Sequence, residues 1–168
     1  MPIVPFGRQH NTEPQSPDMA GARRVVSILP PERMQALGGL PAEAIAGAFD
    51  GDGLSVETFR QNPRFVEFMH AVIRTAGPTD PDLQLAAQAQ HDGWIYVIDL
   101  RTPEGPAGRV PPEDVIGAFE VRSGHVVPDS YQPNDAHRVF AANGLVRLPR
   151  GLFEAFLEAL PRVSESRA

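Results

Sequence analysis

The residue with the clearest chemical potential is Glu104, a carboxylate in a short loop between two expected strands. The first strand has the sequence Trp-Ile-Tyr-Val-Ile-Asp (residues 94–99), and the loop after it is rich in proline and glycine. The sequence Val-Pro-Pro-Glu-Asp-Val-Ile-Gly-Ala-Phe (residues 110–119) then leads into the second strand. Carboxylates of this kind can stabilise a positive charge that develops on a substrate. An exposed acid on a surface loop explains Glu104 equally well.

This strand–loop–strand pattern resembles the C-terminal half of the catalytic domain of bacterial ADP-ribosyltransferase toxins, the cholera- and pertussis-like group. Further similarities follow in the same order along residues 23–148. They are Pro30-Pro31-Glu32 before Gly38-Gly39-Leu40, the segment Gly53-Leu54-Ser55-Val56-Glu57-Thr58 before a helix, and Asn134-Asp135-Ala136-His137-Arg138.

The resemblance implies an enzyme that uses NAD as a substrate and transfers ADP-ribose to a target protein. Such a reaction breaks the nicotinamide–ribose bond through an oxocarbenium-like state, which a nearby carboxylate stabilises. In this interpretation Glu104 is catalytic, Arg24 binds a phosphate of NAD, Ser55 supports the pocket, and Trp94 or Tyr96 packs beside the cofactor.

Each of these assignments has a structural alternative. Arg24 could be a surface charge at a strand end, Ser55 a turn or cap residue, and Trp94 and Tyr96 the core and edge of a sheet. Arg24 also lies one position earlier than the family's arginine. The alternative functions are therefore a catalytically inactive domain of the same fold, or an unrelated small interaction or immunity-type protein that acts by protein binding.

Composition narrows the classes of partner. The 168 residues carry a net charge of −6, which argues against a nucleic-acid partner, and no apolar run is long enough to span a membrane. There is no Cys, and the five His residues lack the spacing of a metal site, so no metal is expected. His70 is expected to be a partly buried structural imidazole.

The N-terminal sequence lacks the features of a signal peptide. We therefore expect a soluble protein of the bacterial cytoplasm, or an effector or toxin domain that a dedicated secretion system delivers. A target protein is the expected partner, and no oligomeric state is predicted.

The expected elements predict an α+β fold with a single globular domain over residues 22–163. Helices should lie mainly in the N-terminal half, with a mixed or antiparallel sheet split around a cleft. Residues 1–21 are predicted as a disordered or loosely packed tail, and residues 164–168 as a frayed C-terminus. Helices are expected at residues 30–37, 41–49, 63–75, 81–90 and 150–160, and strands at 24–29, 94–100, 115–122, 126–127, 138–140 and 145–148.

Local signals support several of these boundaries. Asn62 and Asp80 each precede a proline and should cap the helices that follow. The dipeptide Asn143-Gly144 favours a type I′ turn in a hairpin. The segments 40–49 and 110–119 have similar sequences, which we interpret as one local turn used twice, because two copies do not indicate a repeat protein.

Overall fold

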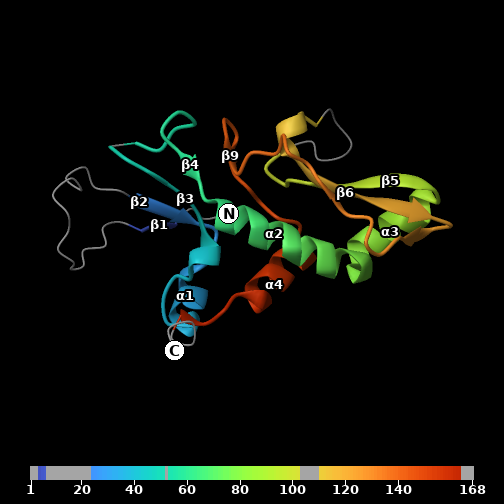
Figure 1. The fold of residues 1–168 in the computed structure, drawn as a ribbon, viewed down its shortest axis with the longest axis horizontal. Coiled ribbons are helices and arrows are strands. Elements are labelled where there is room, and N and C mark those ends of the chain that lie inside the picture. The colour runs from blue at the N-terminus through green and yellow to red at the C-terminus, as the bar shows by residue number, and fades with distance from the viewer. Residues whose placement is uncertain (1–3, 7–23, 52, 103–109, 164–168) are drawn as a thin grey trace. The chain divides into compact units, whose positions relative to one another are not determined.

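The structure is a computed structural model that describes residues 4–6, 24–51, 53–102 and 110–163. The fold is α+β, as the sequence predicts, and every strand pairing within the described residues is antiparallel. The chain divides into two compact units, whose helices and strands are labelled in Figure 1. Unit 1 comprises residues 1–67, 139–145 and 160–168, and unit 2 comprises residues 68–138 and 146–159.

Unit 1 is built on a four-stranded sheet with the order β1-β2-β3-β4. Its strands are β1 (Val4–Phe6), β2 (Arg24–Ser27), β3 (Ile45–Phe49) and β4 (Arg60–Gln61). Between β2 and β3 the chain forms helix α1 (Pro31–Leu37) and the 3-10 turn η2 (Ala42–Ala44). The short hairpin of β9 (Phe140–Ala141) and β10 (Gly144–Leu145) also belongs to this unit.

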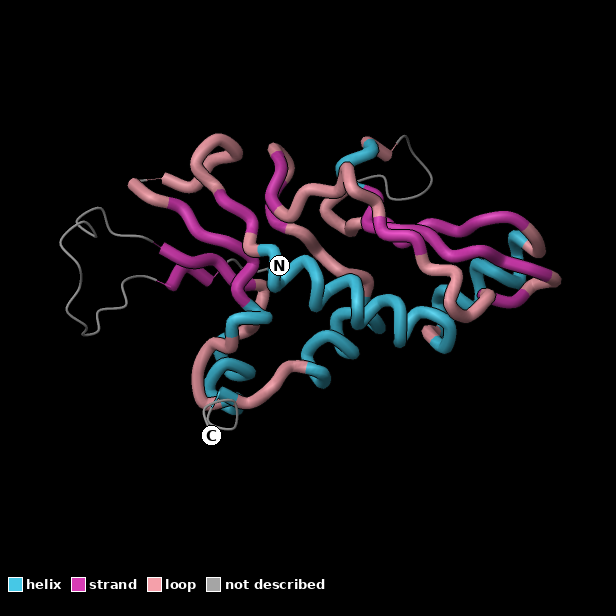
Figure 2. The backbone as a smooth tube through the Cα atoms, viewed as in Figure 1, coloured by secondary structure: helices cyan, strands magenta, loops and turns pink. Residues whose placement is uncertain are grey.

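Unit 2 contains the second sheet, in which β5, β6 and β7 follow one another and β8 pairs with β6. Helix α3 packs against β5, β6 and β7 of this sheet (Figure 2). The strands are β5 (Gly93–Ile98), β6 (Val115–Arg122), β7 (His125–Val126) and β8 (Gln132–Pro133). The helical elements are η3 (Gly77–Thr79), α3 (Pro81–Gln90), η5 (Pro112–Asp114) and α4 (Arg150–Ala159); helix α2 (Pro63–Ala76) begins in unit 1 and continues into unit 2.

The predicted helix caps are confirmed. The Asn62 side chain accepts a hydrogen bond of 3.2 Å from the backbone N–H of Arg64, in the first turn of α2. The Asp80 carboxylate accepts a bond of 3.1 Å from the N–H of Leu83 at the start of α3. Each cap satisfies a backbone donor that the first helical turn leaves without an intrahelical partner.

The helix expected at residues 41–49 is wrong. Only Ala42–Ala44 form a turn, and Ile45–Phe49 form strand β3 between β2 and β4. Alanine favours a helix by only a fraction of a kilocalorie per residue, so strand pairing on both sides of the segment outweighs that preference. The structure also places Val4–Phe6, part of the predicted tail, in β1 beside β2.

The expected hairpin forms, but its turn type differs from the prediction. Gly144 lies opposite Ala141, so Ala142 and Asn143 are the two loop residues. A type I′ turn needs positive φ at both loop residues, and among the described non-glycine residues only His91, Ser123 and Asp129 have one. The positive φ of 117° falls on Gly144, after the loop.

The two segments of similar sequence, residues 40–49 and 110–119, share a backbone as well. Each makes one 3-10 turn after a proline and then enters a strand, and both strands begin with the same order of buried and half-buried positions. The turns close with equal bonds of 2.9 Å, from the Ala44 N–H to the Pro41 carbonyl and from the Asp114 N–H to the Pro111 carbonyl.

The likeness extends to the neighbouring strands. Val26 of β2 lies opposite Gly47 of β3, and Val97 of β5 lies opposite Gly117 of β6. In both pairs a register shift follows immediately after that valine. Strand β4 pairs with β3 at Gly47, as β8 pairs with β6 at Gly117.

An asparagine fixes each turn in the same way. The Asn62 and Asn134 side-chain amides each donate to two carbonyls, one in the turn and one at the start of the strand. These bonds reach Ala42 (3.1 Å) and Ile45 (2.8 Å) from Asn62, and Pro112 (2.9 Å) and Val115 (2.7 Å) from Asn134. We therefore call residues 24–64 the first repeat and residues 95–136 the second repeat. The local turn is used twice, as the sequence predicts, and the likeness extends beyond it to the neighbouring strands.

Candidate functional site

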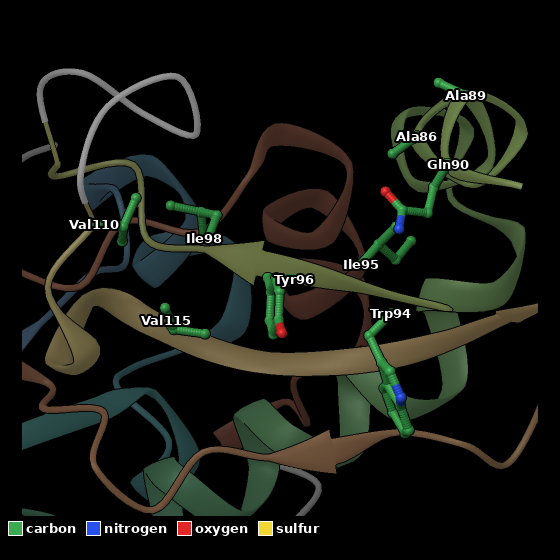
Figure 3. A pocket seen from close by; sticks show the side chains of 9 residues that line it. All are labelled: Ala86, Ala89, Gln90, Trp94, Ile95, Tyr96, Ile98, Val110 and Val115. Carbon is green, nitrogen blue, oxygen red and sulfur yellow. The ribbon is translucent and has the colours of Figure 1, made fainter. Parts of the chain in front are cut away.

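A hollow of about 920 Å³ lies in unit 2 beside strand β5. Its lining comes from α3, β5, the start of β6 and Val110, which precedes η5, and Figure 3 shows these side chains around it. The lining residues are Ala86, Ala89, Gln90, Trp94, Ile95, Tyr96, Ile98, Val110 and Val115. None of them carries a charge, so the hollow suits an uncharged ligand surface.

Trp94 and Tyr96 are the two exposed aromatic residues of this site. Trp94 is 43% exposed and Tyr96 is 59% exposed, although both belong to a sheet. Alternate residues of a strand point to opposite faces, so these two rings share a face while Ile95 and Val97 are buried on the other. The alternative of a position at a sheet edge is confirmed for both rings, and a core position is wrong.

A cluster of charged side chains is buried just beyond the end of β5. Asp99 and Asp114 are fully buried, and Arg101 and His137 are nearly so. The Arg101 Nε lies 2.9 Å from Asp114 Oδ1 and 3.3 Å from Asp99 Oδ2, so one guanidinium serves both carboxylates. The His137 Nε2 lies 3.0 Å from Asp99 Oδ2.

This charged cluster also holds the backbone around it. Arg101 Nη2 donates to the carbonyls of Glu113 (3.0 Å) and Arg138 (2.6 Å), and the Thr102 hydroxyl donates to Asp114. The cluster therefore positions residues 99–102, which lead directly into residues 103–109. Its side chains are buried among the described residues, so the role that the structure shows for them is to hold this part of the backbone.

A second cluster of polar side chains lies around Tyr131, a residue of the second repeat. The Tyr131 hydroxyl and His70 Nδ1 are hydrogen-bonded at 2.8 Å, and the Arg74 guanidinium lies 5.4 Å from the Tyr131 ring centre. Burial, with smaller contributions from His137 and Arg74, lowers the pKa of His70 to about 4. Burial also raises the pKa of Tyr131 well above its usual range. His70 is thus a half-buried neutral imidazole at neutral pH, which confirms the structural role expected for it.

The predicted site residues fall in different parts of the structure. Glu104 lies outside the described residues, and Arg24 is half-buried in β2 of unit 1. Ser55, also in unit 1, belongs to a local turn in which its hydroxyl lies 3.1 Å from the Thr58 hydroxyl. The Thr58 N–H also bonds the Ser55 hydroxyl at 3.2 Å. This confirms the turn alternative for Ser55, while cofactor roles for Arg24 and Ser55 stay predictions. Trp94 and Tyr96 lie in unit 2, where both line the hollow.

Sequence reasoning missed the α3 wall of the hollow and the charged cluster. Ala86, Ala89 and Gln90 belong to a helix that the sequence predicted without a binding face. Asp99 and Asp114 belong to the two segments on either side of the Glu104 loop, and the sequence analysis assigned them no role. The available signal was the uncharged strand Gly93–Ile98 with two aromatic residues on one face.

Within the described residues no group of three His, Asp or Glu side chains could hold a metal ion. No helix of the described chain is long and apolar enough to cross a membrane. Comparison with known proteins found no matching family model, no matching curated protein and no matching solved structure.

Proposed function

We propose that this chain is a protein-binding domain and that the hollow beside β5 is its contact surface. The observation that carries the proposal is the exposure of Trp94 and Tyr96 on an uncharged wall. Aromatic side chains bury a large area at little entropic cost, and they are enriched at protein interfaces where charges are depleted. This function matches the interaction-protein alternative that the sequence left open.

The experiment is a selection of peptides from a phage-displayed random library against the full chain. Trp94 is the only tryptophan, so its fluorescence reports binding at the hollow. Selected peptides should shift that fluorescence in a saturable manner and should bind Tyr96→Lys much more weakly. Leu85→Lys is the matched control, because Leu85 is 64% exposed on α3 and does not line the hollow. Selection without any Tyr96-dependent binder would overturn the proposal.

A second candidate is the mono-ADP-ribosyltransferase activity that the family resemblance implies. The observations that favour it are the two exposed rings, Trp94 and Tyr96, and Val110, which also lines the hollow and directly follows the segment that carries Glu104. Among the described residues the lining has no cation for the phosphates of NAD, so their binding would need a charged residue from elsewhere. In that function Glu104 stabilises the ribose cation as the nicotinamide leaves, and a target protein accepts the ADP-ribose. The chain would then act as a bacterial effector or toxin domain.

The test of the second candidate is nicotinamide release from NAD by wild type, Glu104→Gln and the control Glu113→Gln. The activity requires release that Glu104→Gln abolishes and Glu113→Gln retains. A rise in melting temperature with NAD but without release would indicate a catalytically inactive NAD-binding domain. If NAD is not cleaved and does not raise the melting temperature, it is excluded as a substrate or ligand of this chain.

A further inference from the structure

The two repeats differ at one edge of their sheets. In the first repeat, β1 pairs antiparallel with β2, so that Pro5 lies opposite Val26 and Phe6 opposite Val25. In the second repeat, β5 takes the place of β2, because Val97 matches Val26 in register. Within the described residues β5 pairs only with β6, so no strand corresponds to β1 there.

The hollow lies along this edge of β5. Its lining includes the successive residues Trp94, Ile95 and Tyr96, which point to alternate faces of the strand. A hollow that both faces border reaches the free edge of the strand, and near Ile98 it extends to Val115 of β6. Figure 3 shows Ile95 and Ile98 on the same side of the β5 ribbon as α3, and Trp94 and Tyr96 on the opposite side of that ribbon.

The strand itself lacks the residue types that keep exposed strands from pairing. Natural edges carry charges, prolines or bulges, but Gly93–Ile98 contains no charged residue and no proline. Its one register shift comes at the end, between Val97 and Ile98. The remaining length offers main-chain donors and acceptors of the kind that bind peptides by strand addition.

We propose that the β5 edge binds an uncharged, extended, apolar segment of a partner protein as an added antiparallel strand. This inference rests on the proposed protein-binding function and defines its ligand. The segment spans about five residues, a usual strand length. Its chemistry is that of β1, Val-Pro-Phe, which occupies the equivalent edge of the first repeat. In the same register the phenylalanine lies opposite Tyr96, where an aromatic cross-strand pair is favourable.

The walls of the hollow favour a single strand over the sheet edge of a second copy. Ala86, Ala89 and Gln90 of α3 border the edge on one side, and Val110 borders it near Ile98. The alanine side chains leave room for an extended segment beside β5. A second β5 edge would bring its own α3 into the same space.

The probe is the synthetic peptide acetyl-Ile-Val-Pro-Phe-Gly-amide, titrated into the full chain. A proline in an edge strand is oriented so that its nitrogen, which has no N–H, points away from the neighbouring strand. Successive residues point their amides to opposite sides, so the Val and Phe amides of the peptide would face β5. Binding should change Trp94 fluorescence and slow hydrogen exchange at the backbone amides of β5. N-methylation of the Phe amide should weaken binding about fivefold to tenfold, the effect of one main-chain hydrogen bond. N-methylation of the Gly amide, which points away from β5, should leave the affinity of the peptide unchanged.

The protein variants and peptides distinguish failure of the strand-addition inference from failure of the proposed protein-binding function. Tyr96→Lys should abolish peptide binding, and Leu85→Lys should retain it. Equal affinity of all N-methylated peptides, or unchanged β5 exchange, overturns strand addition while the protein-binding function stands. If library-selected peptides bind and this probe does not, the assigned ligand chemistry is wrong. A dimer of the full chain that Tyr96→Lys dissociates would identify a second copy as the occupant and overturn the inference.

Discussion

The two repeats use one backbone arrangement with different interiors. In the first repeat, Ile28 lies two residues after the valine that faces the glycine, and Ala44 lies at the end of the turn. Both are fully buried. At the same two positions the second repeat has Asp99 and Asp114, which are also fully buried. The first repeat therefore forms the same turn and strands with no buried charge at these two positions; its fully buried polar residue there is Ser27, whose hydroxyl donates to the Ala44 carbonyl at 2.7 Å.

Buried charges stabilise a fold poorly, because the cost of removing them from water offsets most of their attraction. Their retention in the second repeat coincides with the other differences between the repeats. That repeat has the open β5 edge, the exposed Tyr96 where the first has half-buried Val25, and the loop that carries Glu104. The features that the repeats share thus define the fold, and those that differ gather around β5 in the second repeat, where we propose the binding surface.

The largest expected effect comes from Asp114→Ala, which gives the second repeat the residue of the first. The change leaves the buried Arg101 guanidinium without its 2.9 Å partner at Asp114. Removing one member of a buried ion pair costs about 3–5 kcal/mol of unfolding free energy, which urea denaturation measures. Glu113→Ala is the control, because Glu113 makes no salt bridge within the described residues and is less buried. A loss below about 1 kcal/mol would show that the cluster is not needed for folding.

The next effect concerns the glycine at the centre of each repeat. A Cβ at Gly47 would overlap the Phe59 ring and the Arg60 carbonyl, and one at Gly117 would overlap the Tyr131 ring. Gly47→Ala and Gly117→Ala should each lower the unfolding free energy by about 1–3 kcal/mol. The loss should be larger at Gly47, because a backbone carbonyl moves less readily than a ring. Gly53→Ala, where the added Cβ meets nothing within 4 Å, is the control.

The sequence predicted the elements whose signals are local. Asn62 and Asp80 with the prolines behind them located α2 and α3, and the alternating apolar run located β6 from Val115 to Arg122. It failed at Ile45–Phe49, where pairing with distant strands decides the structure.

The candidate site, like the fold, was predicted only in part. Trp94 and Tyr96 were identified as binding residues by family resemblance, and they do line the hollow. The α3 wall and the partnership of Asp99, Arg101 and His137 depend on contacts between residues far apart in the chain. The repeat was visible as a sequence likeness, but its extent rests on Asn62 and Asn134, which lie outside the two similar segments.

A smaller difference should separate the two asparagines. Both Asn62→Ala and Asn134→Ala remove two hydrogen bonds from the side-chain amide to turn carbonyls. Asn62 also caps the 14-residue helix α2, whereas Asn134 bonds the Ala136 N–H in a short turn. Asn62→Ala should therefore destabilise the chain more, by about 1 kcal/mol, the usual effect of a lost cap. Equal losses in urea denaturation would show that the cap at α2 contributes nothing measurable.

The last difference is a pH dependence of His70, a residue of α2 that bonds Tyr131 of the second repeat. The first repeat has Phe59 where the second has Tyr131, whose hydroxyl bonds His70. Burial lowers the pKa of His70 from 6.5 to about 4, so the unfolded chain binds the extra proton first. The stabilisation is complete above pH 6.5, falls as the pH drops towards 4, and is lost below it. His70→Gln cannot titrate, so its unfolding free energy should decline less than that of wild type between pH 7 and pH 4. Parallel decline of the two proteins would mean that the buried imidazole is not the titrating group, and the polar pair around Tyr131 would then distinguish the repeats in packing alone.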